Sequence, residues 1–200
     1  MRNGWKIVII EPRIERAEVG LMGNVLKEPL NYSLVLIGFM GTGKSTVSAY
    51  LSEKYHMETI DMDQVIAEEE GMSIPHIFEQ YGEAYFRNLE TSLLKRLQMK
   101  KHVVISCGGG TALRAENVKE MKKNGRVVLL TAAPATIYER VKNSDERPIL
   151  RGNKNIEYIS SLMEERAEKY ELAADVIVET DHKTVAEICE EIITRVMELK

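Results

Sequence analysis

Residues 33–46 read SLVLIGFMGTGKST, an apolar run that leads directly into a glycine-rich loop. Residues 38–45 match the pattern G-x-x-x-x-G-K-[ST] at every position. Glycines allow the tight turns that aim successive backbone N–H groups at one point, and a following helix adds its positive N-terminal end. The stretch therefore predicts a strand, a phosphate-binding loop and a helix in succession, a unit that holds a nucleoside triphosphate.

Two side chains complete the predicted phosphate site. In this pattern the amine of Lys44 reaches the β- and γ-phosphates, and the hydroxyl of Ser45 ligates Mg²⁺. A chance glycine turn is the alternative, but an expected strand before the loop and an expected helix after it favour phosphate binding. We expect ATP as the nucleotide. The loop alone leaves open whether water, a protein or a metabolite receives the γ-phosphate.

Apolar runs alternate with helical patterns along the rest of the chain. Strands are expected at residues 33–37, 58–60 (ending at Asp61), 103–105, 127–130 and 176–178. Helices are expected at residues 44–56, 63–99 with interruptions near Gly71 and Gly82, 115–124, 134–142, 156–172 and 185–199. This alternation predicts an α/β fold of three layers, α/β/α, with a central parallel sheet of the P-loop kinase type. The strands are continuous apolar runs, as expected when both faces of a sheet are covered.

The ends of the pattern set the expected domain boundaries. Residues 143–155 are polar and charged with a glycine and a proline, so we expect an exposed, mobile lid there. Residues 33–200 are expected to form one P-loop kinase domain. Residues 1–32 stand apart as an N-terminal extension of unknown role, either poorly ordered or an extra edge strand.

Composition narrows the class of protein. The chain has 200 residues and a net charge of −4, which lacks the basic excess of a general nucleic-acid binder. No apolar run approaches the ~18 residues of a membrane span. The N-terminal apolar stretch has no small-residue cleavage site after it, and two cysteines are too few for a disulfide framework. We expect a cytoplasmic protein that binds neither nucleic acid nor membrane.

Two further loops follow expected strands. Asp61 and Asp63 come at the end of the second strand, where ligands bind in open α/β sheets, and one carboxylate can hold the water of a magnesium ion while the other orients an acceptor hydroxyl. The alternative is that one of them only caps the next helix. Gly108, Gly109 and Gly110 follow the third strand and let a small ligand press on the backbone, whereas a plain turn needs one glycine.

Four arginines are candidates for anion binding: Arg87, Arg140, Arg147 and Arg166. A guanidinium binds a carboxylate or phosphate through two parallel hydrogen bonds, which a lysine cannot copy. Taken alone, each arginine is equally well explained as a surface charge. Glu83 and Glu90, for example, lie at helical spacing from Arg87 and predict ordinary ion pairs.

Six segments taken together resemble the shikimate kinases. In order they are GFMGTGKS, DMD, GEAYFRNLE, SCGGGT, ERPIL and ERAEKY, and the resemblance runs from about Ser33 to the C-terminus. Many small-molecule kinases share the P-loop and the Asp-x-Asp. The combination of F-R-x-x-E, the glycine triplet and the R-P-[IL]-L lid is more specific. The resemblance implies transfer of the γ-phosphate of ATP to the 3-hydroxyl of shikimate, in chorismate and aromatic amino acid biosynthesis.

The resemblance also implies roles for individual residues. ATP would be bound by Gly41, Thr42, Gly43, Lys44, Ser45, Thr46, Arg140 and Arg147, and shikimate by Asp63, Arg87, Gly108, Gly109, Gly110 and Arg166. The catalytic residues would be Lys44, Asp63 and Arg147, with Asp63 as the base. Mg²⁺ would be held by Ser45 and, through water, by Asp61. Glu90 would steady Arg87, Arg147 would arrive with the lid, and residues 180–184 would wrap the adenine beside Arg140.

Other functions remain open at this point. A kinase of gluconate or of a nucleoside monophosphate would share the P-loop, but we do not expect the glycine triplet in either. A non-catalytic nucleotide-binding switch would be expected to lack Asp63 or the substrate arginines, and all of these residues are present. The resemblance favours a monomer.

Overall fold

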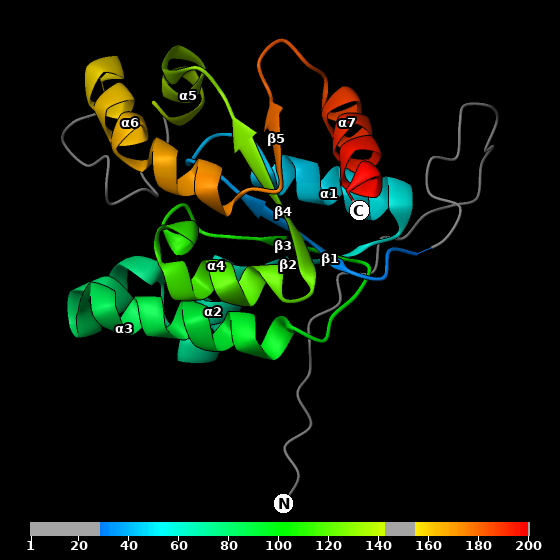
Figure 1. Ribbon diagram of the computed structural model, residues 1–200. Coiled ribbons are helices and arrows are strands. Elements are labelled where there is room, and N and C mark those ends of the chain that lie inside the picture. The colour runs from blue at the N-terminus through cyan, green and yellow to red at the C-terminus, as the bar shows by residue number, and fades with distance from the viewer. Residues whose placement is uncertain (1–28, 143–154, 200) are drawn as a thin grey trace, which may run out of the picture.

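A five-stranded parallel sheet forms the centre of the protein, as seen in a computed structural model that describes residues 29–142 and 155–199 (Figure 1). The strands are β1 (Ser33–Ile37), β2 (Glu58–Asp61), β3 (Val103–Ser106), β4 (Gly125–Thr131) and β5 (Val176–Glu179). Their order across the sheet is β2-β3-β1-β4-β5, and every pairing is parallel. This arrangement confirms the predicted α/β fold.

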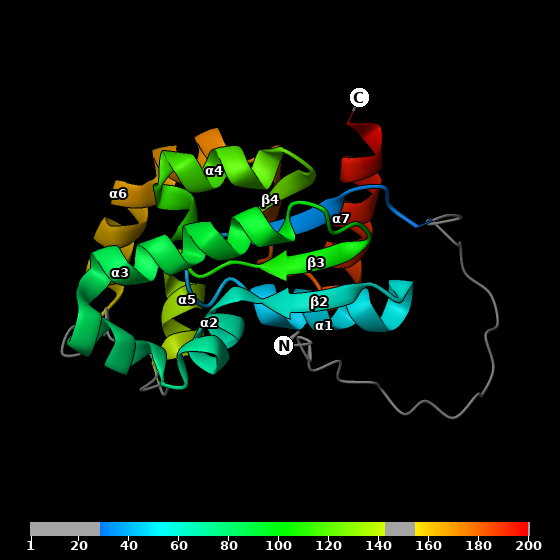
Figure 2. The same ribbon diagram turned by 90° about the horizontal axis from the view of Figure 1, so that it is seen from below.

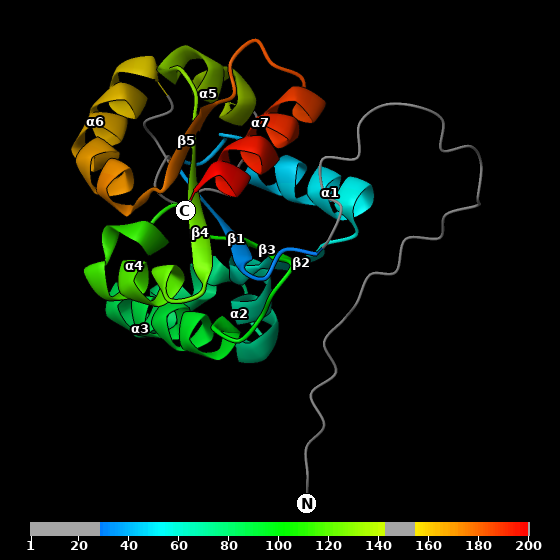
Figure 3. The ribbon, with the colours of Figure 1, turned by 45° about the vertical axis from the view of Figure 1, so that its right-hand side comes forward.

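Helices cover both faces of the sheet (Figure 3). The helices are α1 (Lys44–Tyr55), α2 (Met62–Glu70), α3 (Ile74–Leu97), α4 (Ala115–Lys122), α5 (Pro134–Val141), α6 (Ile156–Ala173) and α7 (Val185–Glu198), with a short 3₁₀ turn at Thr111–Leu113. On one face, α1 and α7 pack on strand residues such as Leu34, Leu36 and Val128. On the other, α3 and α4 pack on Val35 and Val127.

The strand that leads into the P-loop, β1, is the central strand of the sheet. All five residues of β1 are buried, because helices cover both of its faces and strands flank both of its edges. The strand β5 differs from the expected continuous apolar burial. Its residues alternate between buried and exposed, and Ile177 is 41% exposed, because β5 lies at the edge of the sheet.

The predicted long helical region between residues 63 and 99 is two helices. Asp61 caps the start of α2, and Gly71 ends that helix. Gly82 interrupts α3 with φ 78° and ψ 172°, a conformation that a residue with a side chain rarely adopts. Beyond this break α3 lies beside α4 (Figure 2), where Lys95 pairs with Glu116 at 2.8 Å.

The structure leaves two sequence predictions untested. Residues 1–28 and 143–154 lie outside the described residues, and these ranges contain most of the predicted N-terminal extension, nearly all of the predicted lid, and Arg147. Among residues 29–142 and 155–199, no helix has the length and apolar character needed to cross a bilayer.

Candidate active site

The carboxyl ends of β1, β2 and β3 bring the predicted motifs to one edge of the sheet. The register pairs Asp61 with Ser106, and Ser106 with Leu36, so the three strands end at nearly the same level. The P-loop, the Asp-x-Asp loop and the glycine triplet therefore start side by side. Ligands of open α/β sheets bind at this edge.

The P-loop has the backbone that its glycines predict. Gly38, Gly41 and Gly43 all have positive φ, at 137°, 78° and 97°. A methyl group at Gly41 would also come within 2.9 Å of Val141 on α5. The side chain of Thr42 donates to the carbonyl of Phe39 at 2.8 Å, which closes the loop on itself.

Lys44 lies with its amine over this loop. It donates to the carbonyl oxygens of Gly38 and Phe39 at 2.9 and 3.0 Å. Ser45 and Thr46 follow in the exposed first turn of α1. The loop thus places one ammonium group, a helix N-terminus and two exposed hydroxyls together, as phosphate binding requires.

Asp61 caps the start of α2, which is the structural role that the sequence offered as an alternative to magnesium binding. Its Oδ1 accepts from the backbone N–H groups of Asp63 and Gln64 at 3.0 and 3.2 Å, which fixes the carboxylate at the sheet edge. Within residues 29–142 and 155–199, no cluster of three or more His, Cys, Asp or Glu side chains could hold a metal ion.

That result fits magnesium bound with a nucleotide. Mg²⁺ keeps several waters and takes one or two protein ligands together with phosphate oxygens, so it needs no cage of carboxylates. The donor set of Ser45 and a carboxylate held at Asp61 has this chemistry.

Each glycine of the triplet lies against a different functional group. A methyl group at Gly108 would come within 2.6 Å of the Asp63 carboxylate, and one at Gly110 within 2.6 Å of the Arg87 guanidinium carbon. A methyl group at Gly109 would lie 3.7 Å from the backbone nitrogen of Met40 in the P-loop, which is ordinary contact. None of the three has a positive φ. Gly108 and Gly110 are therefore needed for close approach and not for backbone conformation.

Arg87 is held on α3 by two carboxylates. Its Nη1 donates to Glu90 at 2.9 Å, and its Nε and Nη2 donate to Glu83 at 3.1 and 2.9 Å. The Arg87 side chain is 18% exposed, Glu90 is fully buried, and Glu83 is 67% exposed. Burial lowers the pKa of Arg87, but the charges and hydrogen bonds of Glu90 and Glu83 outweigh it and the pKa is raised.

A buried polar network lies beneath Arg87. The hydroxyl of Thr111, at the end of the glycine triplet, donates to Glu90 at 2.5 Å. The Asn117 amide donates to the carbonyl of Thr111 at 2.9 Å and accepts from Thr91 at 2.6 Å. Burial raises the pKa of Glu90, and the charge of Arg87 opposes that shift. The network ties the arginine to the glycine loop and leaves its orientation little freedom.

Arg166 reaches the same region from α6. Its guanidinium lies over the ring of Phe39 in the P-loop, 5.7 Å from the ring centroid. Its Nε is buried and has no hydrogen-bond partner within the described part of the chain. A buried guanidinium nitrogen without an acceptor is costly, so this group is suited to an anionic ligand.

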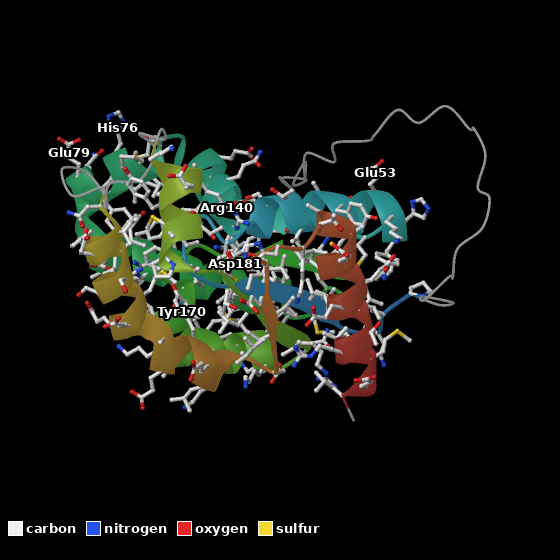
Figure 4. The ribbon with its side chains drawn as sticks, turned by 90° about the horizontal axis from the view of Figure 1, so that it is seen from above. Glu53, His76, Glu79, Arg140, Tyr170 and Asp181 are labelled. Atoms are coloured by element: carbon white, nitrogen blue, oxygen red, sulfur yellow. The ribbon has the colours of Figure 1, made fainter. Side chains whose placement is uncertain are left out.

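Arg140 and Asp181 join α5 to the loop that follows β5 (Figure 4). Arg140 donates through Nη1 to the carbonyl of Gly41 at 3.0 Å and to the hydroxyl of Thr180 at 3.3 Å. Asp181 accepts from the backbone of Ala133 at 2.7 Å and from Thr136 at 2.5 Å. The side of the P-loop expected to receive adenine is thus bordered by Arg140 and residues 180–181.

Asp181→Asn should make the stability of the protein less dependent on pH. Burial raises the pKa of Asp181, but the hydrogen bonds and the charge of Arg140 outweigh it and hold the pKa below its ordinary value of 3.8. The stabilisation is therefore present above pH 3.8 and is lost as the pH falls through the folded-state value. Urea unfolding should show a loss of about 1 kcal/mol at pH 7 and almost none in acid. An equal loss at both pH values would contradict this account.

The structure brings together almost all of the residues that the sequence singled out. Asp63, Arg87 and the glycine triplet form one cluster beside the P-loop. Arg147 lies outside the described residues, so its position stays a prediction. No sequence pattern predicted a role for Thr111 and Tyr170, which contact the glycine triplet, for Asn117, which holds Thr111, or for Phe39, which lies under Arg166. The four-residue spacing of Arg166 and Tyr170 was the one signal that pointed to a shared helix face.

Comparison with known proteins agrees with this geometry. A family model described as shikimate kinase matches residues 40–197. A shikimate kinase of Sulfurihydrogenibium sp. (strain YO3AOP1) is 44% identical over 164 residues, which cover 82% of this chain and 97% of that protein. A shikimate kinase of Persephonella marina is 42% identical over 82% of this chain and 98% of that protein.

A solved structure extends the similarity to three dimensions. The shikimate kinase from Acinetobacter baumannii, determined in complex with shikimate, has a TM-score of 0.78 and 31% sequence identity to this chain. The match covers 84% of this chain and 96% of that one.

Proposed function

This chain belongs to the shikimate kinase family of ATP-dependent phosphotransferases with an alcohol acceptor, and from that premise we propose how its own residues bind and phosphorylate shikimate. The observation that carries the proposal is the cluster formed by the glycine triplet, Asp63 and Arg87, because it places a base and a carboxylate-binding group against one short loop.

The acceptor site is proposed to hold the carboxylate of shikimate with Arg87 and Arg166. Arg87 is oriented by Glu90 from beneath, and Arg166 has a buried Nε that needs an acceptor. The triplet of residues 108–110 offers backbone without side chains against the ring. A ligand without a carboxylate leaves the buried Nε of Arg166 without an acceptor and adds no partner to Arg87, so such analogues bind poorly.

Asp63 is proposed to orient the 3-hydroxyl of shikimate and to accept its proton. The carboxylate lies against Gly108, at the carboxyl edge of the sheet and beside the P-loop. Phosphoryl transfer depends mainly on alignment and charge neutralisation, so fixing this hydroxyl in line with the γ-phosphate is the central task of the site.

The P-loop is proposed to bind ATP through its amides and the amine of Lys44, with Ser45 and Asp61 placed to hold Mg²⁺. When bound, Mg²⁺ would neutralise phosphate charge. Lys44 would exchange the carbonyls of Gly38 and Phe39 for phosphate oxygens. Arg140 is proposed to border the adenine, since it already spans Gly41 and Thr180.

A lid over residues 143–155 is proposed to close the site and deliver Arg147 to the phosphates. Closure would exclude water, which otherwise hydrolyses ATP.

We also propose that residues 33–200 are the catalytic domain, that residues 1–32 are a separate extension, and that the protein is a cytoplasmic monomer. Both cysteines are buried and unpaired, which is consistent with a reducing compartment.

The proposal is tested by measuring ADP formation with ATP, Mg²⁺ and shikimate. Shikimate should stimulate ADP formation strongly over the acceptor-free rate, and EDTA should abolish the stimulation until Mg²⁺ is restored. Stimulation that persists in EDTA would contradict the assignment of Ser45 and Asp61 to magnesium.

A further inference from the structure

Tyr170 is a buried tyrosine that the proposed mechanism does not use. It lies on α6 and is 5% exposed. It belongs to a core cluster that includes Leu129 of β4 and Phe86 of α3, and its hydroxyl donates to the carbonyl of Gly109 in the glycine triplet. The side chain thereby joins α6 to a loop that lies 61 residues earlier in the sequence.

The same phenol lies close enough to the two arginines proposed to bind the acceptor for their charges to act on it. The charge of Arg166, one helical turn earlier, and the charge of Arg87 both act on the hydroxyl, while burial raises the pKa of Tyr170 more than they lower it. Tyr170 therefore stays neutral near pH 7, where it can donate to Gly109 and accept from Arg166. The rest of the Arg166 guanidinium is steadied by the ring of Phe39.

We propose that Tyr170 is a positioning residue for acceptor binding, whose hydroxyl holds the Gly109 carbonyl and the Arg166 guanidinium in one arrangement. This inference rests on the proposed function. Phenylalanine at this position would fill the core equally well, so packing does not explain the hydroxyl. The hydroxyl has a role if it links the glycine triplet to Arg166, because this link would fix the distance between the two before shikimate binds.

The chain provides a matched control at Tyr32. That hydroxyl also donates to a backbone carbonyl, of Val196 at 3.3 Å, and an arginine, Arg126, lies 5.1 Å from its ring centroid. Tyr32 is at the opposite end of β1 from the P-loop. Tyr32→Phe therefore makes the same chemical change with the same kind of neighbours, away from the site.

The experiment compares steady-state kinetics of the full chain with those of Tyr170→Phe and Tyr32→Phe. We expect Tyr170→Phe to raise KM for shikimate about tenfold, with KM for ATP unchanged and kcat within about threefold. Tyr32→Phe should leave all three constants unchanged. Combined with Arg166→Lys, the Tyr170→Phe effect on KM should be less than additive, because the two residues act as one unit.

Three outcomes would overturn the inference. Tyr170→Phe could leave KM for shikimate within twofold of the parent value, or raise KM for ATP equally, or add fully to Arg166→Lys. The second outcome would mean that Tyr170 supports the fold and not the acceptor site. Failure of the proposed function is distinguishable, because the unsubstituted protein would then lack shikimate-dependent turnover.

Discussion

Asp63→Asn should lower kcat by about 10²–10⁴-fold, the range for loss of a positioned general base. The amide is almost the same size, so its fit against Gly108 is preserved, but it cannot take the proton of the acceptor hydroxyl. KM for ATP should change little, because the P-loop is untouched. The measurement is kcat and both KM values at saturating Mg²⁺.

A second aspartate supplies the control. Asp175 accepts from the backbone N–H of Val127 at 2.8 Å and pairs with Lys122, at the other end of β4 from the site. Asp175→Asn should lower stability and leave kcat unchanged. If Asp63→Asn retains more than about a tenth of kcat, Asp63 is not the base and only positions the substrate.

Gly110→Ala should raise KM for shikimate about 100-fold while ATP still binds. The new methyl group would come within 2.6 Å of the Arg87 guanidinium carbon, and the buried pair with Glu90 leaves the guanidinium nowhere to move without losing that partner. A displaced arginine costs alignment as well as affinity. Isothermal titration with shikimate and with ADP separates the two effects.

Gly109→Ala, in the same triplet, is the matched comparison. A methyl group there would meet its nearest atom, the nitrogen of Met40, at 3.7 Å, which is ordinary contact. We expect a smaller loss of shikimate affinity than for Gly110→Ala. Equal losses in the two variants would show that the approach of Arg87 to Gly110 is not what the triplet protects.

The sequence predicted best those features that depend on local pattern. The buried run of residues 33–37, the P-loop and the following helix all form as expected, because glycine positions and apolar periodicity are local signals. The interruption of the helix at Gly82 was predicted from the glycine alone. In the structure Gly82 has φ 78° and ψ 172°, which lie outside the helical region. Motif order then indicated which loops share one edge of the sheet.

The features that the sequence could not show depend on long-range contact. Asp61 caps α2 and remains a candidate for magnesium, and only the structure shows that one carboxylate oxygen is occupied. The glycine triplet was expected to accommodate a ligand, but Gly108 and Gly110 also accommodate the side chains of Asp63 and Arg87. The link from Tyr170 to Gly109 spans 61 residues, and no local pattern carries such a contact.

Acceptor selectivity tests most directly whether this site phosphorylates shikimate. ADP formation should be measured with shikimate and with gluconate side by side, at one ATP and Mg²⁺ concentration. Gluconate also has a carboxylate and hydroxyls, but its open chain must lose more conformational freedom than a ring to hold one hydroxyl beside Asp63 while Arg87 and Arg166 hold the carboxylate. We predict a kcat/KM at least about 100-fold higher for shikimate. Comparable values, or no stimulation by shikimate while ATP still binds, would contradict the assignment of the acceptor site.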